Sequence, residues 1–89
     1  MGLNTVELVL WAEKEFQVDI PSVDAEKLLT VGQLSLYIQY KRQATKGLKV
    51  LTEKNVFARI KDRLVSEYKV EANTITRTSY FAADLQLDQ

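Results

Sequence analysis

Met1-Gly-Leu-Asn-Thr-Val-Glu-Leu-Val-Leu-Trp-Ala-Glu-Lys-Glu-Phe16 is a helical segment with more apolar surface than one buried face requires. Its first stripe at helical spacing comprises Thr5, Leu8, Val9, Ala12 and Phe16. Leu3, Val6 and Leu10 form a second line at i, i+3 and i+7. A surface helix needs only one stripe, so the second either belongs to a helix buried on two sides or is a docking surface.

Three acidic residues favour the docking interpretation. If the first stripe faces the core, the second lies exposed beside Glu7, Glu13 and Glu15. An apolar centre with a charged rim is typical of a protein-protein interface.

The 89 residues form one small domain that contains neither cysteine nor histidine. Thiol and imidazole chemistry are therefore excluded, together with most metal sites. The acidic residues are scattered along helical faces, so we expect no catalytic residues, no metal site and no enzymatic activity. The sequence has no signal peptide and no long apolar run, which predicts a soluble, cytoplasmic protein that does not bind membranes.

The net charge is zero, but the middle of the chain is basic. Residues 27–63 carry nine bases against two acids, while residues 1–26 carry six acids against one base. The central bases include Lys41, Arg42, Lys46, Lys49 and Lys54, without aromatic residues interleaved at regular spacing. This pattern favours a solvated connection over a nucleic-acid-binding surface.

Capping signals divide the first half of the chain into three helices. Asn4 and Glu7 have the spacing of a capping box for a helix that ends near Phe16. Pro21 makes Ile20 extended, so that Ile20 can plug the core. Ser22 then caps a helix of one or two turns, for which we expect the inward residues to be Val23, Leu28 and Leu29.

A second capping box, Thr30-Val-Gly-Gln33, opens the third helix, which reaches Tyr40. Residues 43–51 contain Gly47 and no clear period, so they are interpreted as a connection. Thr52 caps the fourth helix, whose apolar stripe comprises Val56, Phe57, Ile60 and Leu64. The long loop that follows is expected to pack on the helices through Ile75, Phe81, Leu85 and Leu87. The sequence therefore predicts an all-α fold, a small four-helix bundle with a long loop.

Two parts of this sequence resemble the acyl carrier protein family. The first part carries Leu3-Asn-Thr-Val-Glu-Leu-Val-Leu10, Glu13-Lys-Glu-Phe16, Ile20-Pro21, Ala25-Glu-Lys27, Thr30-Val31 and Tyr37-Ile38. It is similar to the second, third and fourth helices of that family. The second part carries Arg59-Ile-Lys61, Val70, Ile75-Thr76, Phe81, Asp84-Leu85 and Leu87-Asp88, and it resembles the family's first helix and long loop.

The two parts stand in reversed order, so the sequence resembles a circularly permuted carrier protein. By this resemblance, 1–42 matches the second to fourth helices, 43–51 is a new connection, and 52–89 matches the first helix and loop of one domain. Permutation is feasible where the original ends of a domain lie close together. The resemblance implies that Asp88 and Leu3 are neighbours in space.

The cut falls on the family's Asp-Ser-Leu motif, whose serine carries 4′-phosphopantetheine. Asp88 matches the aspartate and Leu3 the leucine, but Gln89 and Gly2 occupy the serine position from either side of the cut. Neither residue has a hydroxyl, so we expect no 4′-phosphopantetheine on this chain.

Partner docking is the property that the resemblance leaves intact. The matching positions are Leu3, Val6, Glu7, Leu10, Glu13 and Glu15. The partners implied are synthases, transferases and phosphopantetheinyl transferases of fatty-acid or polyketide biosynthesis. Asn4 stands where an aspartate is usual and Lys14 where an acid is common, which weakens the field that attracts a basic partner.

Two alternatives remain at this stage. The chain could span the junction of two consecutive carriers, in which case its helices would complete a second copy and form a swapped dimer rather than a monomer. It could also be an unrelated helical adaptor, or a nucleic-acid-binding module that uses the basic middle.

Overall fold

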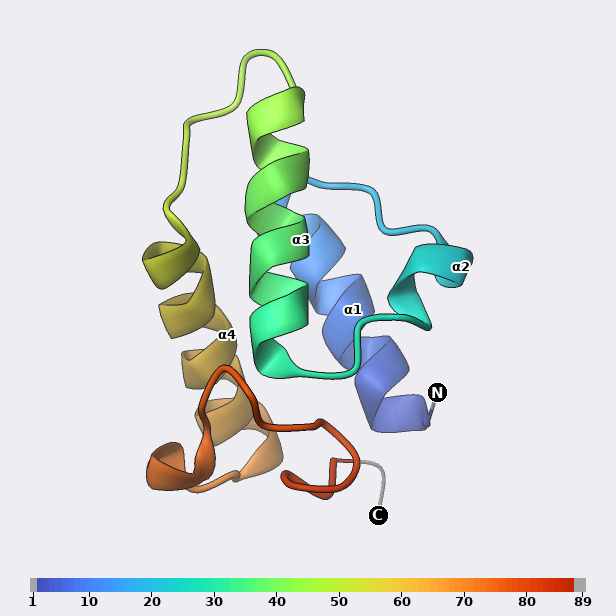
Figure 1. Cartoon of the computed structure of the whole chain (residues 1–89), viewed down its shortest axis with the longest axis vertical. Helices are drawn as coiled ribbons and strands as arrows, with labels where there is room; N and C mark the ends of the chain where they lie inside the picture. Colours follow the sequence, from blue (N-terminus) through green and yellow to red (C-terminus); the bar gives the residue numbers. More distant parts are fainter. Residues whose placement is uncertain (1, 88–89) are drawn as a thin grey trace.

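The computed structural model describes residues 2–87, and the chain over this range is helical without a named strand (Figure 1). The elements are α1 (Leu3–Phe16), α2 (Ser22–Ala25), α3 (Val31–Ala44), α4 (Glu53–Tyr68) and a 3-10 turn, η1 (Ala72–Thr74). The predicted all-α class with four helices is confirmed. In Figure 1, α3 lies between α1 and α4, and the long loop after α4 returns beneath them toward the start of α1.

One stripe from each long helix forms the core. In α1 the buried residues are Thr5, Leu8, Val9, Ala12 and Phe16, as the periodicity predicts. The buried apolar residues of α3 and α4 are Val31, Leu34, Ile38, Val56, Ile60 and Leu64. Ile20 and the loop residues Ile75, Phe81, Leu85 and Leu87 are also buried, so their predicted core roles are confirmed. The burial of α1 on two sides is ruled out, because Leu3 is 75% exposed and Leu10 is 52% exposed.

Two of the three long helices, α3 and α4, begin at the capping residues that the sequence predicts. The Thr30 side chain accepts the Gln33 N–H at 3.1 Å, and the Gln33 side chain accepts the Thr30 N–H at 3.0 Å, which completes the capping box. Thr52 likewise accepts the N–H of Asn55 at 3.1 Å at the start of α4. These side chains satisfy amides that the helices leave without partners in their first turn.

The prediction for α2 is wrong in its details. Ser22 is already helical, and Pro21 stands at the N-cap without a side-chain cap. Val23 and Leu29 are exposed and Ala25 is the buried residue of this helix, whereas Leu28 is half-buried and packs against the core as predicted. The reason is length, because a helix of four residues turns only one position toward the core.

A hydrogen bond from α3 holds the short helix α2. The Tyr37 hydroxyl donates to Asp24 Oδ2 at 2.7 Å. Burial, followed by this hydrogen bond, raises the pKa of Tyr37 well above its ordinary value. The phenol therefore stays protonated and remains a donor into the alkaline range, where an ordinary tyrosine loses its proton.

The long loop is attached to the start of α3 through backbone hydrogen bonds. The N–H groups of Val31 and Gly32 donate to the carbonyls of Ser79 at 3.1 Å and Arg77 at 2.8 Å. Phe81 returns an N–H to the Leu29 carbonyl at 3.0 Å. This pairing brings the loop so close that a Cβ added at Gly32 would lie 2.6 Å from the Arg77 carbonyl oxygen.

The Arg77 side chain fastens the same loop to α4. Its guanidinium donates to both carboxylate oxygens of Glu53, at 2.9 Å and 3.0–3.1 Å. It also lies over the Phe57 ring, with 4.3 Å between the guanidinium carbon and the ring centroid. A planar guanidinium suits both contacts at once, which a lysine would not.

We predict that Gly32→Ala lowers the free energy of unfolding by about 1–3 kcal/mol, because the added methyl group collides with backbone that has to shift. This loss should exceed the gain in helix propensity from alanine. Urea denaturation of both proteins measures it. Leu36→Ala, at a position of α3 that is 58% exposed, is the control and should change the value by no more than about 0.5 kcal/mol. An unchanged midpoint for Gly32→Ala would contradict the close approach.

Candidate functional site

The outward side of α1 carries an exposed apolar face. Leu3 and Leu10 are exposed, Val6 between them is half-buried, and Glu7 is exposed beside them. Glu7, Leu10 and Lys14 also line a shallow groove between α1 and α4. The inward stripe fixes this orientation, because burial of the stripe turns these residues toward solvent.

The two remaining acids of the predicted docking set have partners within the chain. Glu13 is half-buried, and its Oε2 atom accepts the Ile20 N–H at 2.9 Å, which holds the segment between α1 and α2. Glu15 faces α4 and pairs with Arg59 at 3.3 Å. Leu3, Val6, Glu7 and Leu10 thus form one continuous face, whereas Glu13 and Glu15 lie on its flanks.

The α4 side of this face is packed with aromatic and cationic groups. Arg63 lies over the Trp11 ring at 5.4 Å, and Trp11 meets Phe16 edge to face at 5.7 Å. Burial, followed by the negative charge of Glu7, raises the pKa of Tyr68. The two ring contacts of Trp11 were not predicted from the sequence.

The start of α1 differs from the predicted capping box. The helix begins at Leu3 with Gly2 at the N-cap, and no side chain caps it. Asn4 lies inside the helix, and its Nδ2 atom donates to the Leu87 carbonyl at 2.5 Å. Asn4 therefore joins the end of the long loop to the first helix. Of the predicted prosthetic-group positions, Gly2 and Leu3 are described, whereas Asp88 and Gln89 lie outside the described residues.

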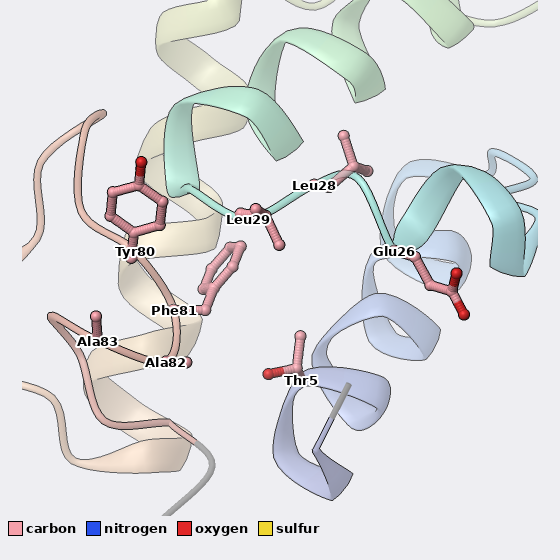
Figure 2. A pocket seen from close by; sticks show the side chains of 8 residues that line it. All are labelled: Thr5, Glu26, Leu28, Leu29, Tyr80, Phe81, Ala82 and Ala83. Carbon is pink, nitrogen blue, oxygen red and sulfur yellow. The ribbon is translucent and has the colours of Figure 1, made fainter.

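An apolar pocket of about 440 Å³ opens beside the first turn of α1 (Figure 2). It lies between α1, the segment that joins α2 to α3, and the long loop. Its lining comprises Thr5, Glu26, Leu28, Leu29, Tyr80, Phe81, Ala82 and Ala83. Glu26 and Tyr80 bring polar groups to the lining, and Figure 2 shows the Phe81 and Leu29 side chains close to one another at its centre.

The sequence did not predict this pocket. Leu28, Leu29 and Phe81 were interpreted as core residues, yet Leu29 is exposed and Leu28 is half-buried. A run of apolar residues beside a helix too short to bury them is the signal that could have indicated an apolar site.

The described residues include no group of three or more carboxylates placed to hold a metal ion. No helix among them is long and apolar enough to span a membrane.

Comparison with known proteins finds a partial match to an acyl carrier protein. The acyl carrier protein of Bdellovibrio bacteriovorus is 48% identical over 43 residues, which amount to 48% of this chain and 55% of the relative. The matched part of the chain thus spans about half the length of that relative. No family model and no solved structure matches the chain. About half of this all-helical chain is therefore similar in sequence to an acyl carrier protein.

Proposed function

We propose that this chain is a carrier-protein scaffold of the acyl carrier type, in circularly permuted order, which docks partner enzymes but carries no prosthetic arm. The observation that carries the proposal is the exposed apolar face of α1, on a segment that resembles the family's recognition helix. Leu3 and Leu10 are too exposed to serve the core, and a docking role explains their presence. The partners would be synthases, transferases and phosphopantetheinyl transferases.

The permuted order is supported by the path of the chain. In this proposal 1–42 supplies the second to fourth carrier helices, 43–51 is the connection, and 52–89 supplies the first helix and loop. The Asn4–Leu87 hydrogen bond brings the end of the loop to the start of α1, where the unpermuted family chain would be continuous. A single chain closes this contact, so a monomer needs no exchange of helices with a second copy.

The residues near the start of α1 do not fit the prosthetic group. Attachment of 4′-phosphopantetheine requires a side-chain hydroxyl, and the start of a helix favours the phosphate. Gly2 offers the helix start without a hydroxyl, and Gln89 has none either. The serines of the chain are Ser22, Ser35, Ser66 and Ser79, none of which lies in an Asp-Ser-Leu motif. Ser35 is buried, and its hydroxyl donates to the Val31 carbonyl at 2.8 Å.

The pocket beside α1 supports an apolar cargo for a carrier of this fold. Its walls are mainly Leu28, Leu29, Phe81 and alanine side chains, which favour an alkyl chain over a polar ligand. The fatty-acid or polyketide intermediates of carrier proteins include such chains. In this chain the pocket would be retained although the means of attachment is absent.

The first test is arm transfer. Incubation of the 89-residue chain with coenzyme A and a phosphopantetheinyl transferase should leave its mass unchanged, because the receiving hydroxyl is absent. Intact-protein mass spectrometry measures this. The Bdellovibrio acyl carrier protein, treated in parallel, is the positive control. A stoichiometric adduct on this chain would refute the proposed loss of attachment.

The second test is docking. A chain that docks without accepting the arm should inhibit arm transfer to the Bdellovibrio acyl carrier protein competitively. Leu10→Lys should raise the inhibition constant on the order of tenfold or more, because it places a charge at the centre of an apolar face. Leu36→Lys, on the exposed side of α3, is the matched control. No inhibition by the unaltered chain, or equal losses in both variants, would contradict docking through α1.

The third test is the contact at the proposed junction. Asn4→Ala should lower the free energy of unfolding by about 1 kcal/mol, because the Leu87 carbonyl loses its donor. Asn4→Asp should lower it as well, since a carboxylate cannot donate and the positive end of α1 offsets only about 0.3–1 kcal/mol. Lys14→Ala, at an exposed position of α1, is the control in the same urea titrations. Unchanged stability in Asn4→Ala would remove this support for the permuted order.

A further inference from the structure

The buried charge of Arg42 contributes neither to the proposed docking face of α1 nor to the pocket. Its side chain is 7% exposed, although it lies in the last turn of α3. The charge pattern of the sequence placed it among the bases of a solvated connection. The structure instead turns the guanidinium inward, toward the end of α1 and the connection between α3 and α4.

Backbone carbonyls surround the guanidinium in place of a carboxylate. Nη1 donates to the Phe16 carbonyl at 2.6 Å, and Nη2 donates to the Lys49 carbonyl. Phe16 is the last residue of α1, where carbonyls lack helical partners and the helix dipole is negative. One cation therefore joins three segments: the end of α1, the end of α3 and the connection.

The connection has two halves of different character. Residues 45–47 follow the end of α3 at Ala44 and are exposed, and Gly47 has a φ of 86° with no heavy atom within 4 Å of an added Cβ. Beyond the Lys49 carbonyl the chain is anchored, because Leu51 is buried and Thr52 caps α4. Figure 1 shows this segment leaving the end of α3 and descending to the start of α4.

We propose that Arg42 is a clasp that divides the connection into a free half and a fixed half. It fixes the chain from Lys49 onward and thereby sets the position from which α4 starts. It leaves the segment around Lys46 free to open without disturbing the helices. This conformational role is independent of the proposed carrier function, because it depends only on the Arg42 contacts.

Limited trypsin digestion tests the clasp, because Lys46 and Lys49 are both cleavage sites and Arg42 holds the carbonyl of the Lys49–Val50 bond. A protease must extract that carbonyl before it can cleave the bond. In the unaltered chain we expect cleavage after Lys46 to be fast and cleavage after Lys49 to be slow. The chain nicked after Lys46 should remain assembled on size exclusion, because the core contacts stay in place.

Arg42→Met keeps a side chain of similar length but donates no hydrogen bond. It should raise the rate of cleavage after Lys49 on the order of tenfold, relative to cleavage after Lys61 within α4, which reports general unfolding. Lys41→Met is the matched control and should leave this ratio unchanged. If Arg42→Met does not fold, Arg42→Lys is assessed by the same ratio, since an ammonium group cannot reach both carbonyls in the planar geometry of arginine. A parallel rise at Lys49 and Lys61, or no rise at Lys49, overturns the proposal.

Discussion

The backbone pairing between residues 29–32 and 77–81 holds the long loop after α4 against the start of α3. Without it, the segment after α4 would have no fixed path across the start of α3. With it, Phe81 enters the core, and the wall of the pocket stands opposite α1. The pairing depends on a glycine, because residue 32 meets a carbonyl oxygen where any side chain would collide. The absence of a side chain at this one position thus permits the close approach of the loop to α3.

The sequence predicts the helices better than it predicts what joins them. Side chains at helix starts are local signals, and the Thr30 and Thr52 caps follow from them because each cap uses residues three positions apart. Asn4 has the same local spacing to Glu7, but the predicted capping box does not form. Its amide bonds to a residue 83 positions away, and no local pattern contains that information. The burial of Arg42 was missed for a related reason, because a base in the last turn of a helix has the same sequence signature whether it is solvated or buried.

The candidate site, too, could be predicted from the sequence only in part. The period of α1 places Leu3 and Leu10 on a second line away from the inward stripe, but only the structure shows that this line is exposed rather than buried on a second side. The separate environments of Glu13 and Glu15 do not follow from the period either, since they depend on where the α1–α2 segment and α4 happen to pass. The pocket was not predictable for the same reason, because its walls come from three segments distant in sequence. Because Arg59 offsets the charge of Glu15, the α1 face is less negative than its composition suggests, and apolar contact would carry more weight in the proposed docking.

The hydrogen bond between Asn4 and Leu87 also bears on how the molecule folds. It closes a loop that includes nearly the whole chain, and closing a loop costs more conformational entropy the longer the loop is. In a chain whose order placed these residues side by side, the same contact would be local and would form early. Here the contact can form only after the helices have assembled, so the permuted order proposed for this chain should fold more slowly than an order in which the two residues were close in sequence. The native contacts alone therefore do not fix the folding rate, because the position of the chain ends decides which of those contacts are local.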